Sequence, residues 1–372
     1  MQAPAAPPAA RPSRGHLQPG TEFAGYRIEA VLGRGGMSVV YLAEHLALGR
    51  KVALKLLAPQ MADDDRFRER FVRESRVAAG MEHSNIVPIY EAGEAEGILF
   101  IAMRYVPGTD LGKLIRREGT LEPERALWIV REVASALDAA HARGLVHRDV
   151  KPGNILVVPG EGSEGRDLVY LSDFGLTKRL ESGTGGLTQT GQFVGTVDYV
   201  APEQIEGRRV DARTDAYSLA CVLFECLTGH VPYGRDTQVA ALYAHLGEKP
   251  PQLTASRPDL PETIDAVVAK ALAKTADSRY ATCGAFAAAV GGSLRPLTEG
   301  AAGHQRPSSG WLRWRAAVGA LAAALITGVI VFSESRGETP AAEGAPSSPT
   351  PSTSPHPSPR AQLRDGRAAT DR

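Results

Sequence analysis

Cysteine is scarce in this sequence of 372 residues, which contains only Cys221, Cys226 and Cys283. Three irregularly spaced cysteines exclude a disulfide framework, and without a CxxC pair they do not indicate a zinc site. Cys221 and Cys226 lie in the apolar segment DAYSLACVLFECLTG, where we expect them to be small buried side chains of a core helix. The folded part of the chain therefore has the cysteine usage of a cytosolic protein.

The chain also lacks a net charge, because 42 lysines and arginines balance 42 aspartates and glutamates. A nucleic-acid partner would require a basic surface, so we expect no such partner. The charge of any bound phosphate must then be neutralised by a local group of residues. Lysine is the rarer base, with eight lysines against thirty-four arginines. A lysine in an apolar segment is therefore a candidate for a specific role.

The first twenty residues lack periodic apolar positions and contain no apolar stretch for a signal peptide. They are rich in proline and alanine, and we expect a disordered leader over 1–20. Strand-like segments such as SVVYLAEH and KVALKLL follow, and longer segments with helical periodicity come after them. This order predicts an α+β fold over 21–292, with a small β-rich lobe over about 21–106 and a helical lobe over about 107–292.

An uncharged apolar run, AAVGALAAALITGVIVF, follows a polar linker over 293–315. Its seventeen residues extend about 25 Å as a helix, the lower limit for crossing a bilayer. The alternative is a buried core helix, but no further folded domain is evident for it to pack against. With Trp311 and Trp314 as interfacial anchors, we expect one transmembrane helix over 316–333.

The charges beside this run predict its orientation. Four arginines precede the run and only Arg336 follows it closely, so the N-terminal part is expected in the cytoplasm of a single-pass protein of the cell membrane. The four are Arg295, Arg306, Arg313 and Arg315. Residues 334–372 are rich in proline, serine and threonine, and we expect a disordered extracytoplasmic tail.

Two segments of the β-rich lobe point to phosphate binding. Glycines in VLGRGGMSVVYLA, at a turn between two strands, would let backbone amides approach a polyphosphate, although a plain β-turn is the alternative. In KVALKLL, Lys55 shares a face with apolar neighbours and would need an anionic partner, unless it is a solvated edge lysine. Glu74 lies on the apolar stripe of the next helical segment, so Lys55 and Glu74 could pair.

Two further segments bring polar groups to the ends of apolar strands. GLVHRDVKPGNILVV places Asp149, Lys151 and Asn154 in one loop, and LVYLSDFGL ends a strand at Asp173. Asparagine and aspartate oxygens are hard ligands that suit Mg²⁺, which is commonly held by few protein groups together with phosphate oxygens. The pattern therefore predicts a metal and phosphate site.

In this order, the motifs GRGGMSVV, VALK, HRDVKPGN, DFG and APE resemble the bacterial Hanks-type, receptor-like serine/threonine protein kinases. The resemblance covers about 21–292 and implies a two-lobed protein kinase fold. It also implies transfer of the ATP γ-phosphate to serine or threonine hydroxyls of protein substrates, with ATP and Mg²⁺ as cofactors and Mn²⁺ as an alternative metal. An inactive scaffold and a small-molecule phosphotransferase are the competing hypotheses.

The resemblance assigns roles within the site. Asp149 corresponds to the catalytic base, Lys151 to the lysine that steadies the γ-phosphate, and Lys55 to the lysine that holds the α- and β-phosphates, with Glu74 as its partner. Asn154 and Asp173 match the two metal ligands. The ATP-contacting positions are Leu32, Gly33, Gly35, Gly36, Val40, Ala53, Lys55, Met103, Tyr105, Val106 and Leu156. Ser38 replaces the third glycine of the family pattern, and Arg104 is atypical for its place in the hinge.

Other positions are implied to be structural or regulatory. Glu203 should pair with Arg279, Asp215 should hold the backbone of the catalytic loop, and His147 is expected to be a packed residue. Residues 159–167 are an insertion that we expect to form a solvent-exposed hairpin.

The segment between DFG and APE contains the expected regulatory positions. Thr188 and Thr190 resemble activating phosphorylation sites, with Arg148 as the partner of the added phosphate, although a merely flexible loop is the alternative. Thr196 matches a threonine that contacts the catalytic aspartate. Family analogy suggests a homodimer through the small lobe.

Overall fold

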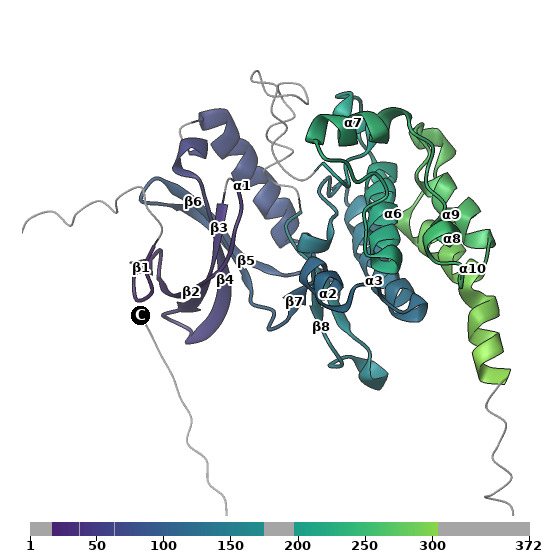
Figure 1. Cartoon of the computed structure of the whole chain (residues 1–372). Helices are drawn as coiled ribbons and strands as arrows, with labels where there is room; N and C mark the ends of the chain where they lie inside the picture. Colours follow the sequence, from purple (N-terminus) through teal and green to yellow (C-terminus); the bar gives the residue numbers. More distant parts are fainter. Residues whose placement is uncertain (1–16, 37, 63, 175–196, 304–372) are drawn as a thin grey trace, which may run out of the picture. The chain divides into compact units, whose positions relative to one another are not determined.

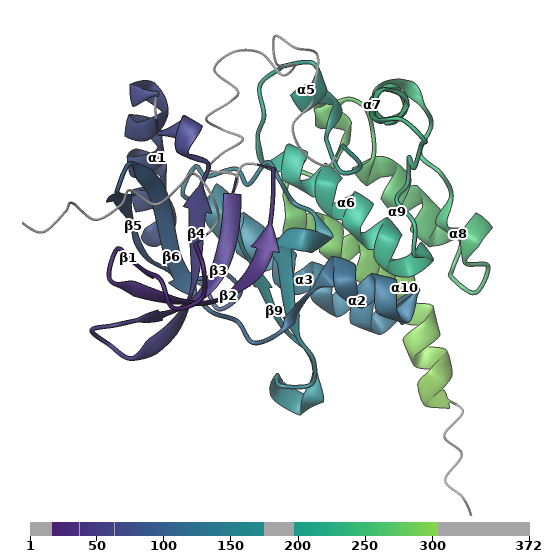
Figure 2. The same cartoon turned by 60° about the vertical axis from the view of Figure 1, so that its left-hand side comes forward.

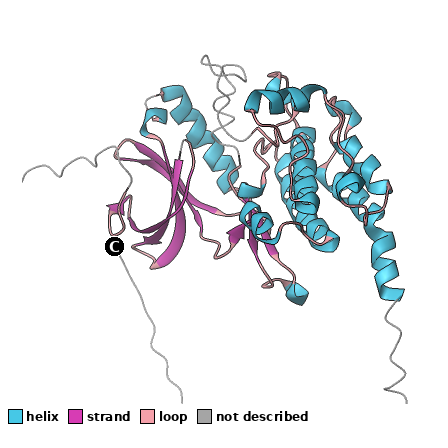
Figure 3. Ribbon diagram, viewed as in Figure 1, coloured by secondary structure: helices cyan, strands magenta, loops and turns pink. Residues whose placement is uncertain are grey.

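The computed structural model describes residues 17–36, 38–62, 64–174 and 197–303, with side chains as far as Arg295. These residues form a smaller lobe built on an antiparallel sheet and a larger lobe that is mainly helical (Figure 1). The colouring by secondary structure shows the same division between strands and helices (Figure 3). The α+β architecture with two lobes, predicted from the sequence, is therefore present.

The smaller lobe contains a six-stranded sheet in the order β1-β2-β3-β4-β6-β5. The strands are β1 (Glu22–Phe23), β2 (Tyr26–Arg34), β3 (Ser38–His45), β4 (Arg50–Leu57), β5 (Ile89–Ala95) and β6 (Ile98–Arg104). A 3-10 turn, η1 (Pro59–Met61), leads to helix α1 (Asp65–Ala79), which contacts β5. The Asp64 side chain caps α1 by accepting hydrogen bonds from the N–H groups of Arg66 and Phe67.

Strand β4 places Lys55 near the centre of this sheet. Lys55 is paired in register with Val40 of β3 and with Ile101 of β6, so strands flank it on both sides. Its neighbours Leu54 and Leu56 belong to a core cluster on one face, and the alternation of a strand directs Lys55 to the other face. The Lys55 side chain is 13% exposed, which excludes the alternative of a solvated edge lysine.

The N-terminal segment contributes to the smaller lobe from Leu17 on, earlier than the sequence predicts. Leu17 is buried in the cluster on the outer face of the sheet, and its N–H donates to the Tyr41 hydroxyl over 3.1 Å. The N–H of Gly20 donates to the carbonyl of Ile28 over 2.8 Å. Residues 17–20 of the predicted disordered leader are thus held by burial of one leucine and by strand β2, whereas 1–16 lie outside the described residues.

The larger lobe combines a small sheet with most of the helices. Its strands are β7 (Thr109–Asp110), β8 (Ile155–Val158) and β9 (Leu168–Leu171), in the order β7-β8-β9. Its longer helices are α2 (Leu111–Glu118), α3 (Pro123–His141), α6 (Ala212–Thr228), α7 (Gln238–Gly247), α9 (Thr263–Ala271) and α10 (Cys283–Gly303). The short ones are η2 (Pro152–Asn154), η3 (Ser163–Gly165), α5 (Pro202–Ile205), α8 (Leu253–Ser256) and η5 (Ala276–Ser278).

Helix α6 forms the centre of the larger lobe. It lies against α3 and α10 and also contacts α8 and α9 (Figure 2). Almost every α6 side chain is buried, including Cys221 and Cys226, which are the small core residues that the sequence predicts. A polar side chain on α6, such as Asp215, is therefore fixed in position by the packing of the whole helix.

One of two further segments differs from the sequence-based expectation, and the other agrees with it. Helix α10 continues to Gly303, so the first part of the predicted linker is helical, and Leu294 extends its buried face by one turn beyond Val290. The 159–167 insertion joins β8 and β9 as the expected hairpin and is exposed over most of its length, while its base is anchored to α3. Asp167 pairs with Arg125 over 2.7 Å, and Arg166 lies over the ring of Trp128.

Within the described part of the chain, no helix has the length and apolar character needed to cross a membrane. The predicted transmembrane helix over 316–333 and the predicted tail over 334–372 lie outside the described residues.

A buried ion pair joins α5 to the segment before α10. Arg279 donates to both carboxylate oxygens of Glu203, each over 2.8 Å, and Thr214 donates to Glu203 over 2.7 Å. The pair predicted from the sequence is thus present. Burial acts to raise the pKa of Glu203, but the hydrogen bonds from Arg279 and Thr214 outweigh it and hold the pKa below its usual value.

We predict that Arg279→Ala lowers the free energy of unfolding by about 3–5 kcal/mol, because it leaves the Glu203 carboxylate buried without its cation. Urea unfolding of the purified chain measures this change. The contribution of the pair is present above the usual carboxyl pKa and is lost as the pH falls through the lowered one, so the difference from the natural chain should shrink in acid. Arg117→Ala, at an exposed ion pair with Glu118, is the control and should cost less than about 0.5 kcal/mol. Equal losses in the two variants would contradict the prediction.

Candidate active site

The loop between α3 and β8 brings together three of the predicted site residues. Lys151 Nζ lies 2.7 Å from Asp149 Oδ2. Asn154 Nδ2 donates to the Asp149 carbonyl over 2.8 Å and to Asp149 Oδ2 over 3.1 Å. An acidic, a basic and an amide side chain are therefore held within direct contact of one another, as the spacing in HRDVKPGN predicts.

The backbone of this loop is held by Asp215 of α6. The N–H groups of His147 and Arg148 donate to the two Asp215 oxygens, each over 2.8 Å, and the Asp215 side chain is fully buried. Arg148 has a positive φ of 66°, a conformation that is unfavourable for a residue other than glycine. The hydrogen bonds predicted between Asp215 and the loop are present, and they support this strained conformation.

A second set of contacts joins the loop to the segment that carries Asp173. The N–H and the hydroxyl of Ser172 both donate to the Asn154 carbonyl, over 2.9 and 3.0 Å. His147 Nε2 lies 3.0 Å from the Ser172 carbonyl, and the imidazole is completely buried. Burial lowers the pKa of His147, so the ring is neutral and occupies the packed position expected for it.

Lys55 reaches across from the smaller lobe to Asp173 of the larger one. Lys55 Nζ lies 2.8 Å from Asp173 Oδ1. Asp173 has a positive φ of 58°, a second strained position in the site. The ion pair predicted between Lys55 and Glu74 is not among those between described residues. Glu74 is buried on α1, as its place on the apolar stripe predicts, and lies 3.8 Å from Arg73.

An apolar cluster adjoins these polar groups and contains five of the eleven positions predicted to contact ATP. Its members come from β3, β4, the segment before β5, β6 and the segment after it, and β8 and β9 of the larger lobe. From the predicted set it includes Val40, Ala53, Met103, Val106 and Leu156, and it adds Val87, Val158, Leu168 and Tyr170. The Arg104 guanidinium lies over the Tyr170 ring, 5.2 Å from its centroid.

The glycine-rich turn between β2 and β3 leaves space beside its backbone. The N–H of Gly35 donates to the Ser38 carbonyl over 2.8 Å, which closes the turn. A side chain added at Gly33 or Gly36 would meet no atom within 4 Å, and Leu32 is exposed. The space beside these backbone amides is consistent with a polyphosphate at this turn.

The residues present suit a hard divalent cation. Asn154 donates through its nitrogen to Asp149, and among the described residues its side-chain oxygen accepts no hydrogen bond. Asp173 supplies a carboxylate at the end of the same network, through Ser172. Amide and carboxylate oxygens are ligands that Mg²⁺ prefers.

Some predicted positions lie outside the described residues, and some contacts were not predicted. Thr188, Thr190 and Thr196 belong to the first group. Sequence reasoning missed Gln204, whose side chain donates to the Arg148 carbonyl over 2.9 Å. It also missed His141, which contacts Asp215. The one available signal was its position on the helical segment directly before the HRD motif.

Comparison with known proteins agrees with this geometry. A family model described as the protein kinase domain matches residues 26–288. The serine/threonine-protein kinase PknE of Mycobacterium tuberculosis is 44% identical over 275 residues, which cover 74% of this chain and 47% of PknE. PknJ of the same organism is 45% identical over 280 residues, which cover 75% of this chain and 47% of PknJ. This chain thus spans about half the length of these relatives.

A solved structure also matches. The crystal structure of the Mycobacterium tuberculosis PknI kinase domain superposes with a TM-score of 0.61 at 36% identity, and the match covers 75% of this chain and all of that domain. The order of motifs, the two lobes and the contacts around Asp149 all fall within the matched region. The chain therefore belongs to the bacterial Hanks-type branch of the protein kinase family.

Proposed function

We propose that the chain is a membrane-anchored serine/threonine protein kinase, which transfers the γ-phosphate of ATP to hydroxyl groups of protein substrates. One observation carries the proposal: Asp149, Lys151 and Asn154 are in direct contact, and Ser172 joins them to Asp173 and thereby to Lys55. These are the residue types that phosphoryl transfer to a hydroxyl requires.

In the proposed reaction, the substrate hydroxyl oxygen forms a bond to the γ-phosphorus while the bond from that phosphorus to the β,γ-bridging oxygen breaks. ADP leaves with the electron pair of the broken bond. The hydroxyl proton passes to the Asp149 carboxylate. The ammonium of Lys151, 2.7 Å from Asp149 Oδ2, stands beside the same position and can steady the transferred phosphate.

Lys55 would hold the α- and β-phosphates, with Glu74 as its partner in the active arrangement. Val40, Ala53, Met103 and Leu156 would enclose the adenine, because they belong to one apolar cluster beside the polar site. Backbone groups of Tyr105 and Val106 would form hydrogen bonds to the base. The turn at Leu32, Gly33, Gly35 and Gly36 would cover the phosphates.

Asn154 and Asp173 would hold Mg²⁺ or Mn²⁺ through their side-chain oxygens. A bound ion of this kind neutralises charge on the β- and γ-phosphate oxygens. In the described structure, the Asp173 carboxylate already forms an ion pair with a cation, the ammonium of Lys55.

Regulation through the segment before APE is part of the proposal. Phosphorylation of Thr188 or Thr190 by the chain itself would add negative charge for Arg148, and Thr196 would contact Asp149. A homodimer through the smaller lobe is one arrangement in which one copy would phosphorylate another. The helix over 316–333 would anchor the kinase domain on the cytoplasmic side of the cell membrane.

We predict that Asp149→Asn lowers kcat by at least about 100-fold, because an amide cannot accept the substrate proton. The dissociation constant for ATP should change by less than about threefold, since Asp149 does not belong to the apolar cluster. Incorporation of labelled γ-phosphate into protein, followed by mass-spectrometric mapping, measures the loss and should find phosphate on Thr188 or Thr190 only in the active chain.

Asp259→Asn is the matched control, because Asp259 is an exposed partner of Arg257 and is distant in sequence from the site residues. It should keep the activity of the natural chain. If the natural chain binds ATP but phosphorylates no protein, or if Asp149→Asn is as active as the control, the proposed function is wrong and a binding scaffold becomes the better account.

The membrane anchor gives a separate prediction. In cells that express the chain, the protein should stay in the membrane fraction after alkaline carbonate washing and leave it in detergent. Replacing Leu321 and Leu325 by arginine should release it, because each charge near the centre of a span costs roughly 2.5–3.5 kcal/mol. Replacing the same two leucines by isoleucine should not. Release of the natural chain by carbonate would contradict the anchor while leaving the kinase proposal intact.

A further inference from the structure

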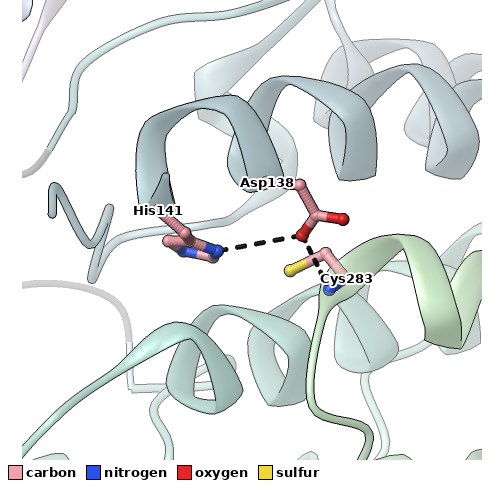
Figure 4. A group of neighbouring side chains, drawn as sticks. All are labelled: Asp138, His141 and Cys283. Atoms are coloured by element: carbon pink, nitrogen blue, oxygen red, sulfur yellow. Dashed lines mark hydrogen bonds and ion pairs between the residues drawn. The ribbon is translucent and has the colours of Figure 1, made fainter. Parts of the chain in front are cut away.

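A group of side chains behind the catalytic loop has no role in the proposed reaction. Asp138 and His141 lie near the end of α3, and they face Cys283 at the start of α10 (Figure 4). Asp138 accepts hydrogen bonds from the N–H of Cys283 over 3.0 Å and from the N–H of Gly284 over 2.9 Å. A carboxylate from α3 therefore satisfies two of the free N–H groups at the positive end of a helix that begins 145 residues later in the chain.

The close approach of these helices depends on a glycine. A Cβ atom added at Gly284 would lie 2.7 Å from Asp138 Oδ2, which is closer than real Cβ contacts. The obstacle is the carboxylate itself, which would have to give up its contact with α10. Gly284 thus permits the contact between Asp138 and the N-terminus of α10.

His141 lies between this contact and the carboxylate that holds the catalytic loop. His141 Nε2 is 2.7 Å from Asp215 Oδ2, and His141 Nδ1 is 3.9 Å from Asp138 Oδ1. The first distance is a hydrogen bond and the second is an ion-pair distance. The His141 side chain is only 11% exposed. The imidazole ring is therefore placed, largely out of water, between two carboxylates that approach it from opposite nitrogens.

The charges around His141 favour its protonated form. Asp138 on its own helix and Asp215 on α6 are the two charges that act on it, while the thiol of Cys283 on α10 is kept neutral because burial raises its pKa. Burial acts to lower the pKa of His141, but the two carboxylates outweigh it and raise the pKa to about 9. Burial likewise acts to raise the pKa of Asp138, but the nearby imidazolium of His141 and the hydrogen bonds from the N–H groups of Gly284 and Cys283 outweigh it and hold the pKa below its usual value.

The same three side chains could be read as metal ligands, since their ligand atoms lie within 4.8 Å of one another. The contacts favour a different role. Both Asp138 oxygens already accept N–H groups of α10, His141 directs one nitrogen to Asp215, and the Cys283 thiol would first have to lose its proton in a buried position. An imidazolium forms a hydrogen bond to Asp215 and lies at ion-pair distance from Asp138 without any of these changes.

We propose that His141 is a positioning residue, a buried imidazolium that couples the N-terminus of α10 through Asp138 to Asp215 and so to the backbone of the catalytic loop. The proposal rests on the proposed kinase function for its consequence in catalysis, although its structural part does not. Asp215 is fully buried and contacts His141 and the N–H groups of His147 and Arg148. Without the positive charge beside it, the carboxylate would be held by neutral donors alone, and the loop that carries Asp149 would be less firmly fixed.

The test compares the natural chain with His141→Gln and Asp138→Asn, and uses Asp259→Asn as the control. Glutamine keeps a neutral donor for Asp215 but removes the charge. At pH 7, both network variants should lower kcat by about tenfold, while KM for ATP stays within about twofold, because neither residue belongs to the apolar cluster. The control should match the natural chain in both constants.

The pH dependence of kcat distinguishes a charged His141 between the two carboxylates from a His141 that acts only by packing. The contribution of the imidazolium is present at low and neutral pH and is lost as the pH rises through about 9, the raised pKa of His141. The ratio of kcat between the natural chain and His141→Gln should therefore fall to less than half of its pH 7 value by about pH 10. Other titrating groups of the site act on both proteins and cancel in this ratio. A ratio that stays constant with pH, or an Asp138→Asn variant with the natural kcat, would overturn the proposal.

A measurement that needs no activity completes the test. NMR of the full chain with labelled histidine should give His141 a pKa close to 9 in the natural protein and a lower one in Asp138→Asn. A value at or below the ordinary 6.5 would refute the bridge even if kcat changes as expected. If the natural chain transfers no phosphate, the kinase proposal fails, and the NMR value alone decides on the bridge.

Discussion

The geometry of the rest of the site depends on the hydrogen bonds that the Asp215 carboxylate accepts. Helix α6 is buried almost throughout, so Asp215 cannot move without the core of the larger lobe. Its oxygens accept the N–H groups of His147 and Arg148, which keeps Arg148 in a strained conformation and sets the direction of the next residue, Asp149. The tightly packed helix thus fixes the position of a loop that has no regular structure of its own.

The contacts around this anchor extend in two directions. Toward the smaller lobe, Asn154 and Ser172 connect the loop to Asp173, which meets Lys55 of β4. Away from the smaller lobe, His141 and Asp138 connect Asp215 to α10. The charged and amide side chains proposed to handle the phosphates are therefore connected across both lobes, by hydrogen bonds and by the step along the chain from Ser172 to Asp173.

The sequence predicts the parts of this site that depend on local pattern. The strand alternation around Lys55, the polar loop at Asp149 and the buried helix around Asp215 can each be read from neighbouring residues. The contact of Asp138 with α10 and the ion pair of Lys55 with Asp173 could not be derived in this way, because they join segments more than a hundred residues apart and leave no periodic signal. Burial of Leu17 was missed for a related reason, since one leucine in a proline-rich segment forms no pattern.

The most direct test of this account is the effect of Asp215→Asn on the purified chain. The variant replaces one acceptor oxygen by an NH₂ group, which cannot accept the loop N–H that it would face. The account predicts that kcat falls by at least about 100-fold, that the dissociation constant for ATP changes by less than about threefold, and that the chain still unfolds cooperatively in urea. A folded variant with nearly natural kcat would show that the catalytic loop does not depend on Asp215, and would contradict the account at its centre.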